Sequence, residues 1–132
     1  MIEINNLSGV PVRKDFLKRV ARKVLEDKKT KCQDLSIVLV KPEKIKELNK
    51  KYRKKNRPTD VLSFKYNDNS GEIVICPEEV KKNAKKFSSN FKKESAKVLI
   101  HGILHLFGLD HEVSKRKAKA MEEKQNYYLS KV

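Results

Sequence analysis

An apolar stretch toward the C-terminal end of the chain contains two histidines four residues apart, and it constrains the fold more than any other segment. His101 and His105 are surrounded almost entirely by apolar residues, namely Val98, Leu99, Ile100, Ile103, Leu104, Leu106 and Phe107. A helix that is apolar on nearly all sides must be buried. We therefore expect a central helix that begins at about Phe91. Its two imidazoles project from one face, one turn apart.

The third histidine of the chain, His111, follows soon after this stretch. Gly108 can end the helix because glycine adopts the left-handed conformation without a Cβ penalty. The reversed chain can then bring His111 back toward the first two rings. Three imidazoles around a vacant fourth position form a catalytic zinc site, whereas structural zinc usually has four protein ligands. We predict that His101, His105 and His111 bind one zinc ion, although nickel or cobalt could replace it. Coincidental packing of the histidines in the core is the alternative.

The spacing of these histidines matches the metalloprotease zinc signature H-E-x-x-H-x-x-G-x-x-H with one departure. Gly102 stands where those enzymes have the glutamate that acts as general base. A glycine cannot accept a proton from a water molecule. The motif therefore predicts zinc but argues against peptide hydrolysis by the usual route.

The charge of the chain is strongly positive and clustered. Lysine and arginine number 32 against 17 acidic residues, which gives a formal net charge of +15. Residues 41–57 contain nine basic side chains against Glu43 and Glu47, and residues 81–97 contain seven against Glu94. Such a field attracts polyanions and speeds their encounter. It predicts binding to nucleic acid, with solvated helix faces as the alternative.

Length and composition set the broad class. A chain of 132 residues is expected to form one domain, residues 1–132. It has no apolar run of 18 residues, and residues 1–4 lack the features of a signal peptide. Cys32 and Cys76 form no metal or redox motif, and Cys76 is expected to be a small buried hydrophobe. We predict a cytoplasmic protein without membrane association or a small-molecule cofactor.

Hydrophobic periodicity predicts an α+β fold in which about five helices pack on a mixed four-stranded sheet, with the zinc site on the central helix. Strands are expected around Ile2 and Ile4, extending at most to Leu7, and over residues 35–40, 61–66 and 72–76. Helices are expected over about residues 13–28, from Pro42, from Pro77 to about Phe87, from about Phe91, and after a Ser114 cap. The first strand, helix and strand should form a right-handed crossover, and the turn at 67–71 should form a hairpin.

A second cluster of chemically useful residues spans Tyr52 to Phe64, where arginine, lysine, aromatic and turn residues are mixed. Arginine presents a planar fork that matches phosphate oxygens. An arginine near zinc could stabilise the extra negative charge of a pentacoordinate phosphorus. The alternative is a basic surface turn in which Asp60 satisfies local backbone donors.

Three motifs together resemble those of the YbeY endoribonucleases, the bacterial ribosomal RNA maturation factors. They are Y-R-x-x-x-x-P-T-D-V-L-S-F from Tyr52, G-E-I-V-I-C from Gly71 and H-G-x-L-H-L-x-G-x-D-H from His101. The resemblance covers nearly the whole chain, although Lys65 stands where many members have proline. It implies a zinc-dependent endoribonuclease specific for single-stranded RNA. Such an enzyme helps form the 3′ end of small-subunit ribosomal RNA and takes part in ribosome quality control.

Roles for individual residues follow from this resemblance and from side-chain chemistry. The resemblance implies that His101, His105 and His111 are the metal ligands and that Arg53 is important for activity. We expect Arg53 to bind the scissile phosphate, and Tyr52 or Phe64 to stack a base. Flanking phosphates would be bound by the neighbouring basic side chains Lys54, Lys55 and Arg57.

The proton acceptor and the attacking group stay open. Asp110 is the nearest acidic candidate for the general base, with a supporting or capping role as the alternative. Either water or the ribose 2′-hydroxyl could attack. Two other functions are possible: a zinc peptidase whose base comes from elsewhere, and a non-catalytic RNA-binding or ribosome-binding module with structural zinc.

Overall fold

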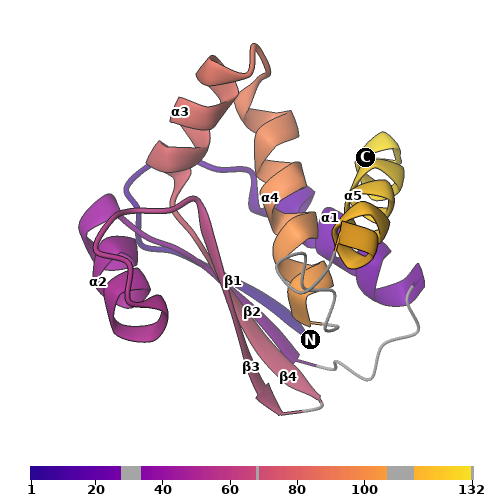
Figure 1. Cartoon of the computed structure of the whole chain (residues 1–132), viewed down its shortest axis with the longest axis horizontal. Helices are drawn as coiled ribbons and strands as arrows, with labels where there is room; N and C mark the ends of the chain where they lie inside the picture. Colours follow the sequence, from indigo (N-terminus) through magenta and orange to yellow (C-terminus); the bar gives the residue numbers. More distant parts are fainter. Residues whose placement is uncertain (28–33, 68, 107–114, 132) are drawn as a thin grey trace.

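A four-stranded mixed sheet forms the centre of the protein (Figure 1). The computed structural model describes residues 1–27, 34–67, 69–106 and 115–131. The strands β1 (Ile2–Asn6), β2 (Asp34–Leu39), β3 (Val61–Asn67) and β4 (Ser70–Ile75) are ordered β1-β2-β4-β3. The pairs β1–β2 and β2–β4 are parallel, and β3–β4 is the antiparallel hairpin that the turn residues predicted. The strand β3 is therefore an edge of the sheet.

Five helices are formed by the described residues, as the periodicity predicted. They are α1 (Lys14–Asp27), α2 (Pro42–Arg53), α3 (Pro77–Lys86), α4 (Phe91–Leu106) and α5 (Lys115–Ser130). None of the described helices combines the length and apolar character needed to cross a bilayer. The observed architecture confirms the predicted α+β fold class.

Local sequence signals explain where several helices begin and end. Proline occupies the first turn of α2 and of α3, where its missing N–H costs no hydrogen bond. The side chain of Asn90 caps α4 by accepting a hydrogen bond of 2.8 Å from the N–H of Lys93. Lys54 adopts a left-handed conformation with φ of 57° and ends α2.

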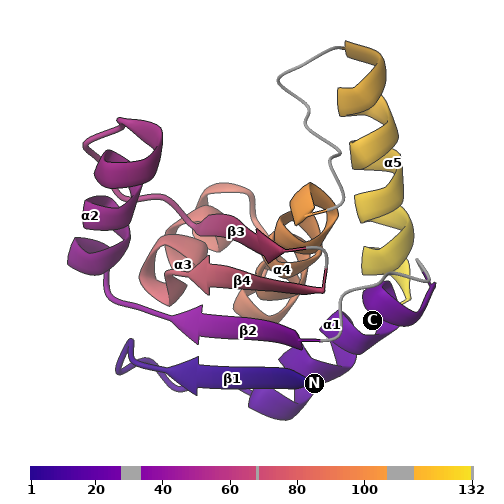
Figure 2. The ribbon, with the colours of Figure 1, turned by 90° about the horizontal axis from the view of Figure 1, so that it is seen from below.

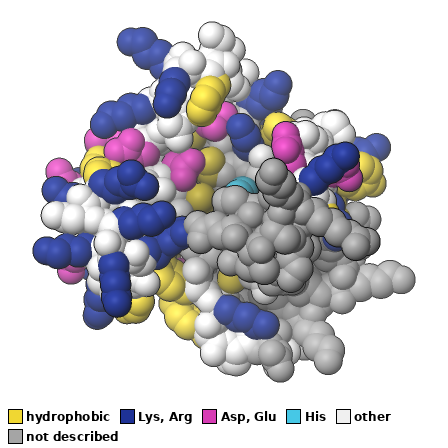
Figure 3. All heavy atoms as spheres, in the orientation of Figure 1, with side chains coloured by type: hydrophobic (Ala, Val, Ile, Leu, Met, Phe, Trp, Pro, Cys, Tyr) yellow, Lys and Arg dark blue, Asp and Glu magenta, His cyan; other side chains and the backbone are white. Residues whose placement is uncertain are grey.

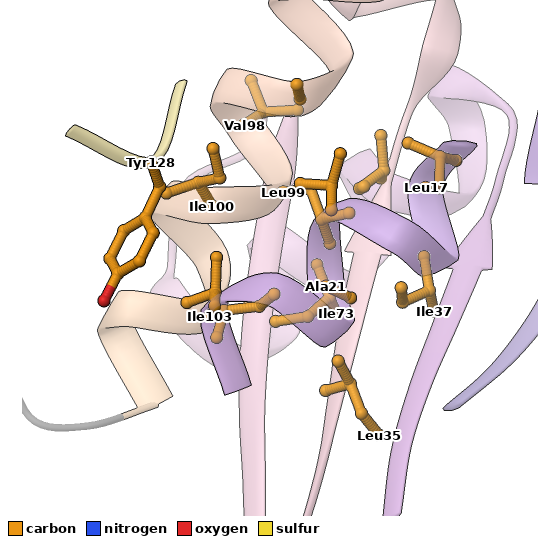
Figure 4. Close-up of a cluster of buried hydrophobic side chains, with 14 of the residues drawn as sticks. Leu17, Ala21, Leu35, Ile37, Ile73, Val98, Leu99, Ile100, Ile103 and Tyr128 are labelled. Atoms are coloured by element: carbon orange, nitrogen blue, oxygen red, sulfur yellow. The ribbon is translucent and has the colours of Figure 1, made fainter. Parts of the chain in front are cut away.

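The two faces of the sheet bury different sets of alternating side chains. One face contributes Leu35, Ile37 and Ile73 to the main core with α1 and α4, and Figure 4 shows these residues together with Leu99 and Ile103 of α4. The other face contributes Leu62 and Val74 to a smaller cluster with Ile45 of α2. Successive strand residues point to opposite faces, so α2 packs on the face opposite α1 and α4. In Figure 2, α3 and α4 lie behind the sheet and α2 stands beside the left-hand ends of its strands.

Cys76 belongs to this smaller cluster and is fully buried. Burial raises the pKa of the Cys76 thiol, because the thiolate loses its hydration. The expectation of a small buried hydrophobe is therefore confirmed.

The helix α4 is central, as its apolar sequence predicted. It contacts α1, α3, α5, β3 and β4. Gly102 allows a close approach to the sheet, since a Cβ atom there would lie 3.1 Å from both Ile73 Cγ2 and Ser63 Oγ. The hydroxyl of Ser63 in β3 donates a hydrogen bond of 2.8 Å to the carbonyl oxygen of Gly102. Packing and a specific bond therefore fix α4 against the edge of the sheet.

Candidate active site

His101 and His105 lie side by side on α4 with their Nε2 atoms converging. The two Nε2 atoms are 3.0 Å apart. The ring centroids are separated by 4.6 Å with an interplanar angle of 68°. Two imidazole nitrogens that share a tetrahedral zinc ion at about 2.0–2.1 Å lie about 3.3 Å apart. The donor set and its spacing therefore fit a zinc ion that is held by both rings.

Gln125 of α5 anchors the opposite edge of the His101 ring. The Nδ1 atom of His101 lies 2.9 Å from Oε1 of Gln125, a buried side chain. When Nδ1–H donates to this oxygen, Nε2 carries the lone pair that a metal requires. The contact is of the kind that fixes the tautomer and the orientation of histidine ligands in metal sites. No sequence pattern pointed to Gln125, which is 24 residues from His101.

The remaining predicted site residues of the histidine segment, Asp110 and His111, lie outside the described residues. Within residues 1–27, 34–67, 69–106 and 115–131, no group of three or more histidine, cysteine, aspartate or glutamate side chains comes together as a metal site. The structure thus brings together the first two predicted ligands, and the third stays a prediction.

A cleft of about 900 Å³ opens beside the histidine pair. Its walls come from the ends of α2 and α3, the edge strand β3, one face of α4, and Gln125 of α5. Figure 3 shows a small area of histidine surface on this side of the molecule, with lysine and arginine side chains spread over α2 and α3 around it. A formal charge of +15 makes such a cleft attractive to a polyanion.

Tyr52 and Arg53, in the last turn of α2, line this cleft together with the histidine pair. The ring of Tyr52 meets Phe64 of β3 edge to face, with the centroids 5.1 Å apart. Both side chains are at least partly exposed. Two segments that are far apart in sequence, the one that begins at Tyr52 and the one that contains His101 and His105, therefore contribute to one site.

Lys54, Lys55 and Arg57 have a different position. They are exposed and are not among the described residues that line the cleft. The buried side chain of Asn49 donates a hydrogen bond of 2.9 Å to the carbonyl oxygen of Arg57, and the N–H of Lys55 bonds to the carbonyl oxygen of Asn49 at 3.3 Å. These bonds hold the basic loop against α2 while its cationic side chains face solvent.

Asp60 also lines the cleft. The alternative interpretation of this segment, in which the Asp60 carboxylate accepts hydrogen bonds from nearby backbone N–H groups, is wrong, because its partners are side chains. Its Oδ2 accepts a hydrogen bond of 3.2 Å from Asn83 Nδ2 of α3, and its Oδ1 lies 3.4 Å from the Thr59 hydroxyl. Asp60, the residue before β3, is therefore tied to α3 on the wall of the cleft.

Other cleft residues were missed by the sequence analysis, and some had a signal. Glu94 and Lys97 precede His101 by seven and four residues, so helical spacing could have placed them on the same face of α4. Phe87 comes from the end of α3, and Gln125 comes from α5. Their positions depend on packing between elements, for which no local pattern exists.

Gly102 has a structural role that its place in the zinc signature did not reveal. A side chain at this position would point at Ile73 and Ser63 of the sheet. The space that a glutamate would need is already filled. The position that carries the general base in metalloproteases is therefore used here to pack α4 on the sheet.

Comparisons with known proteins agree with one another. The family model described as endoribonuclease YbeY matches residues 3–132. The protein named endoribonuclease YbeY from Thermotoga petrophila is 46% identical over 121 residues, which cover 83% of this chain and 81% of that protein. The protein of the same name from Aquifex aeolicus is 35% identical over 127 residues, covering 92% and 85%. A solution structure from Thermotoga maritima has a TM-score of 0.66 at 41% identity, and the match covers 98% of this chain and 87% of that chain.

Proposed function

Because the chain belongs to the YbeY family of endoribonucleases and is thus an RNA-cleaving hydrolase, we propose that it is a zinc-dependent enzyme that cuts single-stranded RNA in the cytoplasm. Its substrate is the precursor of small-subunit ribosomal RNA, whose 3′ end it helps form, and it acts in ribosome quality control on the small subunit. The main supporting observation is the pair of Nε2 atoms 3.0 Å apart beside a cleft that also contains Arg53.

His101 and His105, together with His111, are the proposed zinc ligands, with one ion per chain. Zinc bound there supplies a Lewis acid for a phosphoryl oxygen or for a water molecule. The carboxamide of Gln125 keeps Nε2 of His101 directed at the ion by accepting the Nδ1 proton. The burial of α4 holds both rings in place without a large entropic cost at each turnover.

Arg53 is the proposed ligand of the scissile phosphate. Its guanidinium stays charged throughout a reaction, and its planar fork can contact two phosphate oxygens. Because it lines the same cleft as the histidines, it can stabilise the negative charge that develops at phosphorus. Asp110 is retained as a candidate proton acceptor, with a supporting role for a ligand as the alternative.

The basic loop and the aromatic wall are proposed to bind the rest of the substrate. Lys54, Lys55 and Arg57 are exposed beside the cleft and would contact phosphates on either side of the cut. Tyr52 has an accessible ring that can stack on a base. Stacking requires an unpaired base, and this requirement supports a preference for single strands.

The decisive experiment compares cleavage by the wild type, His105→Ala and Arg53→Ala, with Lys54→Ala as a matched control outside the cleft. The substrates are single-stranded RNA, the same sequence as a duplex, and ribosomal RNA precursor. We expect His105→Ala to lose cleavage while it keeps its fold and RNA affinity. Arg53→Ala should lower kcat about 100-fold with a smaller loss of affinity, and Lys54→Ala should lower affinity alone.

Three results would contradict the proposal. Undiminished cleavage by His105→Ala would exclude metal chemistry at this pair. Simple unfolding of His105→Ala would favour a structural metal. Equal cleavage of duplex and single strand would exclude the proposed preference. The ends of the products answer the remaining question, since a 2′,3′-cyclic phosphate requires attack by the ribose hydroxyl.

The salt dependence of RNA binding tests the role of the basic loop. Each phosphate contact releases condensed counterions, so affinity should fall steeply as salt rises. For Lys54→Ala we expect the slope of log affinity against log salt to become shallower by roughly 0.7, the value for one contact on a single strand. A flat salt response of the wild type would exclude the basic surface as the docking face.

A further inference from the structure

Phe87 is an exposed aromatic ring inside the cleft that the proposed reaction does not use. Its side chain is 58% exposed, yet it lines the same cleft as His101 and His105. It comes from the end of α3, whereas the predicted aromatic residue Tyr52 comes from α2. Single exposed apolar residues are common on protein surfaces. A phenyl ring within a catalytic cleft, by contrast, is in reach of the substrate.

The backbone around Phe87 is held in a defined geometry. The N–H of Phe87 bonds to the carbonyl oxygen of Asn83 at 2.9 Å, and the N–H of Ser89 bonds to that of Ala84 at 2.8 Å. Ser88 lies in the left-handed region, with φ of 53°, and its N–H bonds to the carbonyl oxygen of Lys85 at 3.3 Å. This combination is the Schellman end of a helix, which satisfies the last carbonyl groups of α3. The ring therefore projects from an ordered corner.

Two lysine ammonium groups accompany the ring. The Nζ atom of Lys86 lies 5.6 Å from the centroid of Phe87, and that of Lys97 lies 5.5 Å from it. Lys97 precedes His101 by one turn of α4, which is roughly 6 Å along the helix axis. The aromatic ring and its cations are thus within a short span of RNA from the histidine pair.

Tyr52 is a second exposed aromatic ring in the cleft with a lysine ammonium group beside it. Tyr52 is 56% exposed, and the Nζ atom of Lys51 lies 5.3 Å from its ring centroid. The cleft therefore has two aromatic rings with adjacent ammonium groups, contributed by different helices. An acidic neighbour, Glu94, also lines the cleft but is only 4% exposed, so its carboxylate presents little surface to a phosphate.

We propose that Phe87 is a second base-stacking site for single-stranded RNA, in which Lys86 and Lys97 bind phosphates next to the stacked nucleotide. This inference rests on the proposed function, because it assigns one more binding site for the same substrate. Aromatic rings flanked by cations bind successive nucleotides with little sequence preference, since every base has a π face. With Tyr52, the site gives the cleft two positions that only unpaired bases can occupy.

The first test uses fluorescence, because the chain contains no tryptophan. Phe87→Trp is made in the His105→Ala background, which prevents cleavage, and is titrated with a single-stranded oligoribonucleotide. We expect the tryptophan emission to be quenched as a base stacks on it. The matched control is Tyr127→Trp, since Tyr127 is 50% exposed and has the Nζ atom of Lys131 5.5 Å from its ring, but is not among the described residues that line the cleft. Its emission should not change.

The second test measures affinity and kinetics. Phe87→Ala should bind single-stranded RNA about tenfold more weakly, with a higher KM and an unchanged kcat. Phe87→Tyr should restore the affinity. In a series of oligonucleotides that each have one abasic position, the one that lacks the base stacked on Phe87 should bind the wild type more weakly. It should bind Phe87→Ala no worse than the intact oligonucleotide does, because the ring and that base act as a pair.

The experiments distinguish failure of the Phe87 stacking site from failure of the proposed function. Unchanged affinity of Phe87→Ala, or an unquenched tryptophan at position 87 while RNA is bound, overturns the stacking site alone. A wild type that neither binds nor cleaves RNA overturns the proposed function and the stacking site together.

Discussion

The floor and the rim of the cleft are built in opposite ways. The floor consists of the histidine pair, Ser63 and Gln125, with Gly102 packed behind it against the sheet. These residues are wholly or partly buried, and hydrogen bonds of 2.8–2.9 Å join Ser63 to Gly102 and Gln125 to His101. The rim consists of Tyr52 and the exposed basic loop at residues 54–57. The difference indicates that the two parts have different roles. The floor holds the reacting groups in position, and the rim determines the affinity for a polyanion.

This division has an energetic basis. Buried groups are held by packing, so a change of one atom in the floor must be absorbed by its neighbours. Exposed cations are surrounded by water and ions, so their contacts within the protein contribute little to stability. Substitutions in the floor should therefore alter folding or metal binding, whereas substitutions in the rim should alter RNA affinity.

The largest expected effect is on stability, at Gly102. Gly102→Glu places a long, charged side chain where even a Cβ atom would lie 3.1 Å from Ile73 and Ser63. Overpacking and burial of a carboxylate should lower the free energy of unfolding by at least about 3 kcal/mol. Urea denaturation followed by circular dichroism measures the change. The variant restores the H-E-x-x-H pattern, yet we expect no peptidase activity from it.

The matched control for this variant is Lys93→Glu, which introduces the same side chain at an exposed position of α4. Its stability should change by less than about 0.5 kcal/mol. A Gly102→Glu protein that is as stable as this control would mean that α4 can move away from the sheet. The close packing of the floor would then be incidental.

The next effect is on metal affinity, at Gln125. Gln125→Leu removes the acceptor that lies 2.9 Å from Nδ1 of His101. Loss of such a supporting contact typically weakens metal binding by about 10- to 100-fold. Competition with a chromophoric chelator measures the affinity, and nitrogen NMR of the imidazoles in the metal-free protein reports the tautomer of His101. Gln125→Glu keeps an acceptor and should keep the affinity.

Asn126 offers a control amide on the same helix, since it is exposed. Asn126→Leu should leave both the metal affinity and the imidazole spectrum unchanged. If Gln125→Leu behaves in the same way, the tautomer of His101 is set by some other group.

These two positions also show how far the sequence could predict the molecule. Periodicity predicted α4 from about Phe91, and spacing alone placed His101 and His105 on one face, because both signals are local. Gln125 is 24 residues from His101 on another helix, so no pattern linked them. Gly102 was recognised as a missing base, but its packing role required the position of Ile73. Sheet order followed the same rule: the β3–β4 hairpin was predicted, while the parallel pairing of β2 with β4 is a long-range contact.

A smaller effect is expected at Ser63, where one hydrogen bond joins the edge strand to α4. Ser63→Ala removes the bond of 2.8 Å to the carbonyl oxygen of Gly102. The loss should lower the free energy of unfolding by about 1 kcal/mol. Ser130→Ala is the control, because its hydroxyl makes the same type of bond to Tyr127 at an exposed helix end. Equal effects of the two variants would show that its place in the floor does not make this bond more stabilising than an exposed one.

The smallest effect is expected for an exposed hydrogen-bonded pair, Tyr66 and Glu72, on the β3–β4 hairpin. This pair provides an exposed hydrogen bond to compare with the buried bonds of the floor. The hydroxyl of Tyr66 donates a hydrogen bond of 2.7 Å to Glu72, and this bond raises the pKa of Tyr66 from 10.0 to about 12. The bond needs the protonated phenol, so its stabilisation is complete below pH 10 and is lost as the pH rises toward 12. Tyr66 is 62% exposed, so the loss should be slight. Thermal unfolding between these two pH values should show a slightly steeper decline for the wild type than for Tyr66→Phe. If the stability lost by the wild type between these pH values is as large as the stability lost by Ser63→Ala, then the exposed Tyr66–Glu72 bond stabilises the protein as much as the partly buried Ser63–Gly102 bond. Exposure would then not decide how much a hydrogen bond contributes.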